Sequence, residues 1–264
     1  MNLAETPVAA PKIFTPEYYA RMRELEAASW WNAGMRDVAG RLLDLAGLAR
    51  EGLLLDVGCG SGQTMSWFLD ARPGWRAVGL DLSIDGLRAA RASGVPRVLR
   101  GSALELPLPS ASVDLVISLD VLQHLPLDGG DRRALTEMAR VLKPGGHVLL
   151  RTNAQTFPRE PDDPEHQFHK YEPAELRQRI EQAGLVVLRL GRLNALLGLA
   201  EIPRELRARR GRSSYHGLLA EPKAEPRWRS APKRAWLSAE GWMVGMGASW
   251  PLGRTTIALC RRPA

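Results

Sequence analysis

Glycines at alternate positions follow an apolar run that contains an acid. Residues 53–57 read Leu-Leu-Leu-Asp-Val, and Gly58, Gly60 and Gly62 come next. Glycine tolerates a left-handed backbone and leaves room for a ligand to approach the main chain. The carboxylate of Asp56 can accept hydrogen bonds from a hydroxylated or cationic ligand. The pattern therefore predicts a buried strand that runs into a ligand-binding loop.

The spacing of these glycines disfavours two nucleotide-binding loops. The dinucleotide fingerprint G-x-G-x-x-G requires its third glycine at position 63, where the chain has Gln63. A phosphate-binding P-loop ends in G-K-[ST], and no lysine follows here.

The loop resembles the first motif, D-x-G-x-G-x-G, of class I S-adenosylmethionine-dependent methyltransferases. Three further elements occur in the expected order: Asp81 at the end of a predicted strand, the segment 118–125 after another strand, and the run 142–147. The resemblance implies S-adenosylmethionine as the cofactor. It implies the following cofactor-binding residues: Trp31, Arg36, Asp56, Gly58, Cys59, Gly60, Asp81, Leu82, Ser83, Ser102, Ala103, Leu104, Leu119, Asp120, Val121 and His124.

The resemblance gives several of these residues distinct roles. Asp81 would bind the ribose diol, with Leu82 and Ser83 lining the adenosine; the alternative is that Asp81 caps the next helix. Ser102 occupies a position where the family often has an acid for the adenine amine, so that contact would lack a charge. Arg36 would pair with the methionyl carboxylate, because a guanidinium matches a carboxylate geometrically.

Two other groups could act on the acceptor or pack the protein. Trp31 could lie over the sulfonium through a cation–π contact, or it could pack a helix. Three residues are catalytic candidates. His124 could serve as a general base, because an imidazole titrates near neutrality, or could make a structural hydrogen bond. The segment 165–171 resembles an H-x-x-x-[YF] stretch of the family, which implies that His169 and Tyr171 face the acceptor and accept or relay a proton. A metal site formed by His166 and His169 with Asp162 and Asp163 is disfavoured, since no further ligand completes a tetrahedral set.

Strand and helix patterns alternate along the chain, which predicts an α/β, doubly wound, Rossmann-like sheet of seven strands. The resemblance implies that the last strand is antiparallel. Strands are expected at 53–57, 76–81, 96–100, 113–118, 147–151, 185–190 and 255–260. Helices are expected at 18–31, 35–48, after the glycine loop, and at 84–92, 132–142 and 173–183.

Three regions follow from this reading. Residues 1–50 form an N-terminal helical cap, residues 51–192 with 251–264 form the S-adenosylmethionine-binding core, and residues 193–250 form a basic, tryptophan-rich, lid-like insertion. The insertion is unusual, because loops between neighbouring elements normally hold a handful of residues. Its tryptophans, with Tyr215 and His216, could line an acceptor pocket or form a small core of their own.

Composition limits the compartment and the partners. The formal charge is +7, and most of it lies in residues 201–234, which offer a contact to an anionic surface. Only two cysteines are present, and neither a signal peptide nor a membrane span is expected, so we predict a cytoplasmic enzyme. No nucleic-acid motif stands out and the oligomeric state is open. We expect methyl transfer to an oxygen or nitrogen of a small-molecule acceptor, in secondary metabolism. The alternatives are a lipid-linked, glycan or macromolecular acceptor docked on the basic insertion, or a repurposed cofactor-binding protein that does not methylate.

Overall fold

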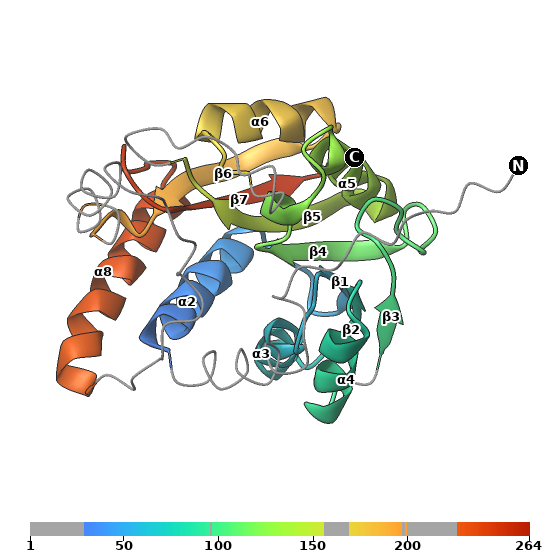
Figure 1. Ribbon diagram of the computed structural model, residues 1–264, viewed down its shortest axis with the longest axis horizontal. Coiled ribbons are helices and arrows are strands. Elements are labelled where there is room, and N and C mark those ends of the chain that lie inside the picture. The colour runs from blue at the N-terminus through green and yellow to red at the C-terminus, as the bar shows by residue number, and fades with distance from the viewer. Residues whose placement is uncertain (1–28, 96, 156–168, 197–198, 200–225) are drawn as a thin grey trace, which may run out of the picture.

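The computed structural model describes residues 29–95, 97–155, 169–196, 199 and 226–264. Seven strands form one sheet in the order β3-β2-β1-β4-β5-β7-β6 (Figure 1). β7 runs antiparallel to both of its neighbours and the other pairs are parallel, which confirms the predicted fold class. The strands are β1 (Gly52–Val57), β2 (Trp75–Asp81), β3 (Val98–Arg100), β4 (Val113–Leu119), β5 (Leu142–Asn153), β6 (Val186–Leu193) and β7 (Thr255–Arg261).

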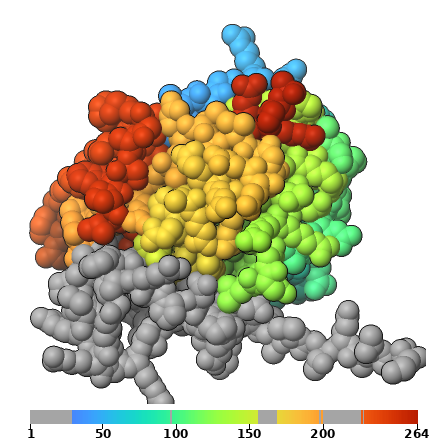
Figure 2. All heavy atoms as spheres, turned by 90° about the horizontal axis from the view of Figure 1, so that it is seen from above, coloured from blue at the N-terminus to red at the C-terminus, as the bar shows by residue number. Residues whose placement is uncertain are grey.

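Helices cover both faces of the sheet. Two of them, α5 and α6, lie on one face, and four others lie on the opposite face (Figure 1). Figure 2 views the molecule from the side of α6, with α5 beside it and α8 at the left margin. The helices are α2 (Trp30–Leu45), α3 (Gln63–Ala71), α4 (Ile84–Ala92), α5 (Gly130–Val141), α6 (Pro173–Gln182), α8 (Arg227–Gly245) and the short 3-10 helix η2 (Leu122–His124).

Alternate residues of each central strand enter different cores. Leu54 packs with α2 and α3, whereas Leu55 packs with α5 on the other side of the sheet. Leu115 and Val116 of β4 divide in the same way. This period of two is what a strand buried on both faces requires, and it explains why the strand sequences are almost continuously apolar.

Some predicted boundaries were wrong. The break expected between residues 31 and 35 does not exist, because α2 runs through it and begins after Ser29, whose hydroxyl accepts from the backbone N–H of Trp31. The turn expected after residue 142 lies inside β5, where Gly145 has a φ of +79° and the pairing with β4 shifts register. Residues 18–28 of the expected first helix lie outside the described residues.

Part of the region before β7 forms a helix that packs on the sheet layer. The helices α2 and α8 lie side by side and run parallel, since Gly34 contacts Leu237 and Gly241 contacts Val38 (Figure 1). Small residues at these contacts let the two backbones approach closely. Within the described part of the chain, no helix has the length and apolarity needed to cross a membrane.

Candidate functional site

The glycine loop ends β1 and turns directly into α3. The backbone N–H groups of Gly58 and Cys59 both donate to the carbonyl of Leu80, at 2.7 and 3.0 Å, which ties the loop to the end of β2. Gly58, Gly60 and Gly62 have φ angles of +77°, +49° and +79°, a region that glycine enters without strain. The sequence pattern therefore reports a real backbone requirement at three alternate positions.

Gly58 is required for a second reason. A β-carbon at this position would lie 2.3 Å from Cγ2 of Val121, which follows β4. The loop after β1 and the loop after β4 therefore touch, and two segments predicted to bind the cofactor come together at the carboxyl edge of the sheet. This edge is where open α/β sheets bind their ligands.

Asp81 lies at the same edge, at the end of β2, and is only 8% exposed. Its carboxylate accepts from the N–H of Gly60 and from the N–H of Ser83, both at 2.8 Å. Burial raises the pKa of Asp81, and the backbone donors oppose that rise. Asp81 does not cap α4, because the cap is Ser83, whose hydroxyl accepts from the N–H of Gly86.

Asp81 keeps room for a ligand. A carboxylate offers about four acceptor positions. The N–H groups of Gly60 and Ser83 use one on each oxygen, and the N–H of Leu82 also interacts with the carboxylate. A hydroxyl of a diol can donate to a position that remains. Leu82, the next residue, is 64% exposed. The acceptor positions of Asp81 therefore fit the hydroxyl groups of the ribose of S-adenosylmethionine.

Two predicted cofactor residues are largely buried. Asp56 is 2% exposed and pairs in register with Gly79 of β2. The sulfur of Cys59 lies so close to Gly79 that a β-carbon there would be 2.7 Å from it. Burial, followed by the charges of Asp56 and Asp81, raises the pKa of Cys59, which keeps it a thiol. The side chain of Cys59 therefore packs inside the protein, and its backbone N–H and carbonyl bind Leu80 and Gly62, so Cys59 shapes the loop.

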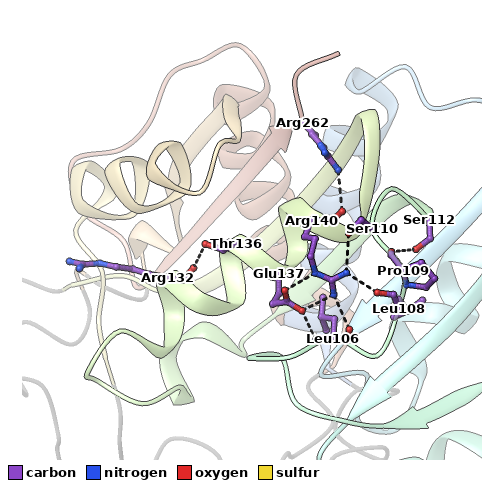
Figure 3. A network of polar contacts seen from close by, with 10 residues as sticks. All are labelled: Leu106, Leu108, Pro109, Ser110, Ser112, Arg132, Thr136, Glu137, Arg140 and Arg262. Carbon is purple, nitrogen blue, oxygen red and sulfur yellow. Dashed lines mark hydrogen bonds and ion pairs between the residues drawn. The ribbon is translucent and has the colours of Figure 1, made fainter.

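The segment after β3 is fastened to α5. Ser102 accepts from the N–H of Leu104 at 3.1 Å, and Ala103 is buried in the core. Glu137 accepts from the N–H of Leu106 at 2.7 Å (Figure 3). Arg140 pairs with Glu137 at 2.7 Å and donates to the carbonyls of residues 106 and 108, at 2.9 Å each (Figure 3). These contacts fix the chain that is expected to border the adenine.

The loop after β4 is held by an arginine that the sequence patterns did not reveal. Asp120 has a positive φ of +61°, and its carboxylate binds Arg151 of β5 at 2.5 Å. The guanidinium of Arg151 lies 5.0 Å from the ring centre of Trp31, and the Trp31 indole N–H donates to Asn194 at 3.0 Å. Leu119 ends β4 and is partly buried. The structure thus brings Trp31, Leu119, Asp120 and Val121 into the same neighbourhood.

A buried glutamate anchors the other end of this group. Glu240 of α8 is 1% exposed and accepts from the N–H groups of Asn194 and Ala195, at 2.5 and 2.9 Å, and from the indole of Trp236 at 2.5 Å. Burial raises its pKa, and these hydrogen bonds oppose the rise. Asn194 also has a positive φ, and its amide donates to Thr255 at 2.8 Å. In the sequence, the only sign of this contact is that Glu240 is an acidic residue among the basic residues of α8.

His124 closes η2, next to the loop after β4. Burial lowers its pKa, and the charge of Asp120 opposes this only in part. The imidazole is therefore neutral near pH 7, the form that can take a proton. Gln123 holds η2 in place, because its side-chain oxygen accepts from the hydroxyl of Thr152 and the N–H of Asn153, at 3.1 Å each.

The other two catalytic candidates have internal partners. Tyr171 is 1% exposed, and its hydroxyl lies 3.2 Å from the carbonyl of Leu122 and 3.1 Å from Asp131. Burial and the charge of Asp131 raise its pKa, so it stays a phenol. His169 lies 3.3 Å from Glu175 and stacks edge-on against Tyr171. These contacts favour a structural role for Tyr171.

Arg36 lies on the side of α2 that faces α3. Gly40, one turn further along, lies against Trp67 of α3, and residues four apart share a helix face. Among the described residues Arg36 has no hydrogen-bond or ion-pair partner. Its charge is therefore available to a ligand carboxylate.

Within the described part of the chain no three His, Cys, Asp or Glu residues form a group that could hold a metal ion, and of the four residues of the metal alternative only His169 is described there. His166, Asp162 and Asp163 lie outside it, as do Tyr215, His216 and most of the basic run.

Residues 55–150 match the family of methyltransferase domains. A protein of Mycobacterium tuberculosis described as an S-adenosylmethionine-dependent methyltransferase is 30% identical over 234 residues, which cover 86% of this chain and 80% of that protein. One of Mycolicibacterium smegmatis is 36% identical over 181 residues, 66% of each chain. A tRNA (carboxymethyluridine(34)-5-O)-methyltransferase of Arabidopsis thaliana is 34% identical over 106 residues, 40% of this chain and 25% of that protein. The chain thus spans less than two thirds of the length of some of the relatives that it matches.

Two solved structures share the fold. Phosphoethanolamine N-methyltransferase 2 of Haemonchus contortus, in complex with S-adenosylmethionine, has a TM-score of 0.63 at 15% identity, over 96% of this chain and 58% of that one. A complex of the Haloferax volcanii Trm112 methyltransferase activator with a methyltransferase has a TM-score of 0.61 at 20% identity, over 97% of this chain and 100% of that one.

Proposed function

Because the chain belongs to the S-adenosylmethionine-dependent methyltransferases, we propose that it methylates an oxygen or nitrogen of a small-molecule acceptor. The observation that carries the proposal is the meeting of Asp81, the glycine loop and Val121 at one edge of the sheet. We place this reaction in the cytoplasm and in secondary metabolism. Two buried free cysteines are compatible with a reducing compartment.

When bound, S-adenosylmethionine supplies an electrophilic methyl group on a sulfonium. The chain's own residues align the reactants and exclude water, which is the main contribution a protein makes to such a transfer. In the proposal Asp81 holds the ribose and Arg36 the methionyl carboxylate. One face of the Trp31 ring lies near Arg151, so a sulfonium contact would use the other face.

His124 is the preferred general base among the three candidates. Its lowered pKa leaves it neutral near pH 7, and it lies beside the loop that carries Asp120. The phenol of Tyr171 already contacts Leu122 and Asp131, so we propose that it supports η2. We propose that His169 also supports η2, since its backbone N–H donates to the carbonyl of Gln123 in that helix.

A macromolecular acceptor is the second candidate, favoured by the charge of residues 201–234 and by the relative named for tRNA. The division into an N-terminal cap at 1–50, a core, and an acceptor region at 193–250 also stays a proposal. The side-by-side packing of α2 and α8 favours treating the cap and the end of the insertion as one layer.

The test is calorimetric titration with S-adenosylmethionine, S-adenosylhomocysteine and NADH. We expect micromolar binding of the two sulfur compounds and none of NADH. Asp81→Asn should weaken that binding at least tenfold, because a hydrogen bond to a charged group contributes about 1.5–3 kcal/mol. Asp70→Asn on the exposed side of α3 is the matched control and should leave the affinity unchanged.

The acceptor class is tested by release of S-adenosylhomocysteine with small-molecule panels and with tRNA. Turnover with a small hydroxyl or amine compound supports the proposal, and turnover with tRNA alone would replace it by the second candidate. If the chain binds both sulfur compounds but releases no S-adenosylhomocysteine with any acceptor, the alternative of a cofactor-binding protein that does not methylate would be favoured.

A further inference from the structure

The outward face of α8 is apolar along its whole length. At 3.6 residues per turn, the residues of this face fall within a strip about 120° wide and about 27 Å long. Trp228 is 71% exposed, Trp242 52% and Met246, directly after the helix, 57%. The α8 stripe consists of Trp228, Ala231, Pro232, Ala235, Ala239, Trp242 and Met246, all of them exposed.

The stripe is separate from the face that α8 buries in the protein. Leu237 and Val244 point into the core shared with α2, and Gly241 contacts Val38. A helix at the protein surface normally turns polar residues to solvent. The core does not explain the α8 stripe, and large exposed apolar surfaces mark contact with a partner or a membrane.

Basic residues border the stripe on both sides. Arg229 and Lys233 lie on one side and Arg234 on the other, each outside the strip in the helical projection. Arg229 lies 4.8 Å from the ring centre of Trp228, and Arg234 pairs with Asp37 at 2.7 Å. The acid of this helix, Glu240, is buried and holds Asn194 and Ala195. The charged residues of α8 that border the stripe are therefore cations: Arg229 is exposed, Lys233 is half-buried 5.5 Å from the ring centre of Trp30, and Arg234 is paired with Asp37 of α2.

The charges distinguish between occupants. A second copy of the chain would bring its own cations against these cations, which costs energy when like charges approach. A surface that is apolar inside and anionic outside meets both requirements. We propose that the α8 stripe lies in the headgroup region of an anionic phospholipid bilayer, with Trp228 and Trp242 as interfacial anchors.

This arrangement uses known membrane physics. Tryptophan is enriched at the bilayer interface because its ring is apolar and its N–H is polar. Interfacial helices combine such an apolar face with flanking Lys and Arg, and anionic lipids attract these cations at short range. The proposal concerns binding alone and holds whichever acceptor is methylated.

The experiment is vesicle co-sedimentation of the full chain. Vesicles of phosphatidylglycerol with phosphatidylcholine are compared with phosphatidylcholine alone, at low and at physiological salt. We expect binding to the anionic vesicles only, weakening as salt rises. Equal partition into both vesicles, or no partition into either, would overturn the proposal.

Two paired variants locate the contact. Trp228→Ser with Trp242→Ser should lower the anionic partition at least tenfold, and Leu127→Ser, an exposed apolar residue elsewhere, should not change it. Arg229→Glu with Lys233→Glu should lower the partition about 25-fold or more, because each cation near an anionic surface contributes about a fivefold factor. The control Arg88→Glu changes an exposed cation on α4 and should have less effect.

A label reports the orientation of the bound protein. Both native cysteines are buried, so a polarity-sensitive dye can be placed by Ala235→Cys on the stripe or by Ala92→Cys on α4. We expect a blue shift with anionic vesicles at position 235 and none at position 92. A shift at both positions would indicate unspecific adsorption and contradict the proposal.

Two other outcomes would replace the occupant. If light scattering showed a dimer, and the double substitution Trp228→Ser with Trp242→Ser made it a monomer, the α8 stripe would be an interface between two copies of the chain. If RNA binding depended on Arg229 and Lys233 while vesicles did not bind, the face would serve nucleic acid.

Discussion

Replacing a glycine of α8 by alanine should separate the packing of two helices from helix propensity. A β-carbon on Gly241 would lie 2.6 Å from Cγ2 of Val38 and 3.1 Å from both Cβ and Cγ1. Val38 is 1% exposed and β-branched, so it cannot turn all three atoms away. A β-carbon on Gly245 would meet Cδ1 of Leu45 at 3.1 Å and Cδ of Arg41 at 3.9 Å, an ordinary contact, and Leu45 is 53% exposed.

The expected magnitudes follow from these contacts. Overpacking of a filled core costs about 1–3 kcal/mol, and alanine in place of a helical glycine gains up to about 1 kcal/mol. The gain is smaller at Gly245, because this residue ends α8, than at Gly241 inside the helix. Gly241→Ala should therefore be less stable than Gly245→Ala by up to about 2 kcal/mol, which corresponds to a difference in Tm of a few degrees.

Denaturant unfolding and calorimetry of the cofactor check this prediction together. Since α2 carries Trp31 and Arg36, a displaced Val38 should also weaken binding of S-adenosylmethionine in Gly241→Ala. In a double-mutant cycle, Val38→Ala should lower the free energy of unfolding by about 0.5–3 kcal/mol less in the Gly241→Ala background than in the wild type. Equal stability of the two alanine variants and an additive cycle would refute the reasoning, because the helices would then have room that the structure does not contain.

Three further outcomes are expected. Gly58→Ala should lower both stability and cofactor affinity in calorimetry, because its β-carbon would lie 2.3 Å from Val121 and the φ is positive; wild-type binding would contradict the loop contact. His124→Gln should reduce kcat about 10²–10⁴-fold if the imidazole is the base, whereas a loss of cofactor affinity with unchanged kcat would favour its cofactor-binding role. Turnover of the wild type should persist below pH 6.5, since burial lowers the His124 pKa. The unfolded chain takes up that proton more readily, so His124 also makes stability fall as the pH drops below 6.5. Arg140 and the N–H of Leu106 lower the pKa of Glu137, whose stabilisation is complete above the ordinary glutamate pKa and lost as the pH falls through the lowered one. Glu137→Gln should therefore lower the free energy of unfolding by about 1 kcal/mol at pH 7 and by less below pH 4, as measured by denaturant unfolding. A loss of stability that does not depend on pH would show that the charge of Glu137 is not responsible.

The sequence predicted those features that depend on local pattern. The apolar run corresponds to β1, because a strand buried on both faces admits few polar residues. The three alternate glycines correspond to the loop after β1, because a left-handed backbone favours glycine. The hydrogen bonds from the glycine loop to Leu80 and to Asp81 could not be predicted from the sequence, because they join residues of different strands. Ser83 rather than Asp81 caps α4, a distinction that two neighbouring polar residues leave open in a sequence.

Other misses have the same cause. Arg151 occupies an ordinary strand position, and only the parallel pairing of β4 with β5 brings it to Asp120. The turn signal at Gly145 was read as the end of an element, but the strand absorbs it as a register shift. The exposed face of α8 was hidden because its tryptophans suggested a core or a pocket, whereas the helix uses leucine, valine and glycine for packing.

The two faces of α8 also connect the site to the surface. Glu240 holds Asn194, Asn194 accepts from Trp31, and Trp31 lies under Arg151, which binds Asp120 beside the expected methyl donor. Each contact in this series is buried or half-buried, so breaking one leaves a polar group without its partner, at a cost of about 1–3 kcal/mol. A displacement of α8 would therefore reach Trp31 through these hydrogen bonds as well as through the packing of α8 against α2. If anionic vesicles alter the affinity for S-adenosylmethionine, Asn194→Ala should weaken that coupling while leaving vesicle binding intact, and the reciprocal effect of the cofactor on vesicle binding must have the same size.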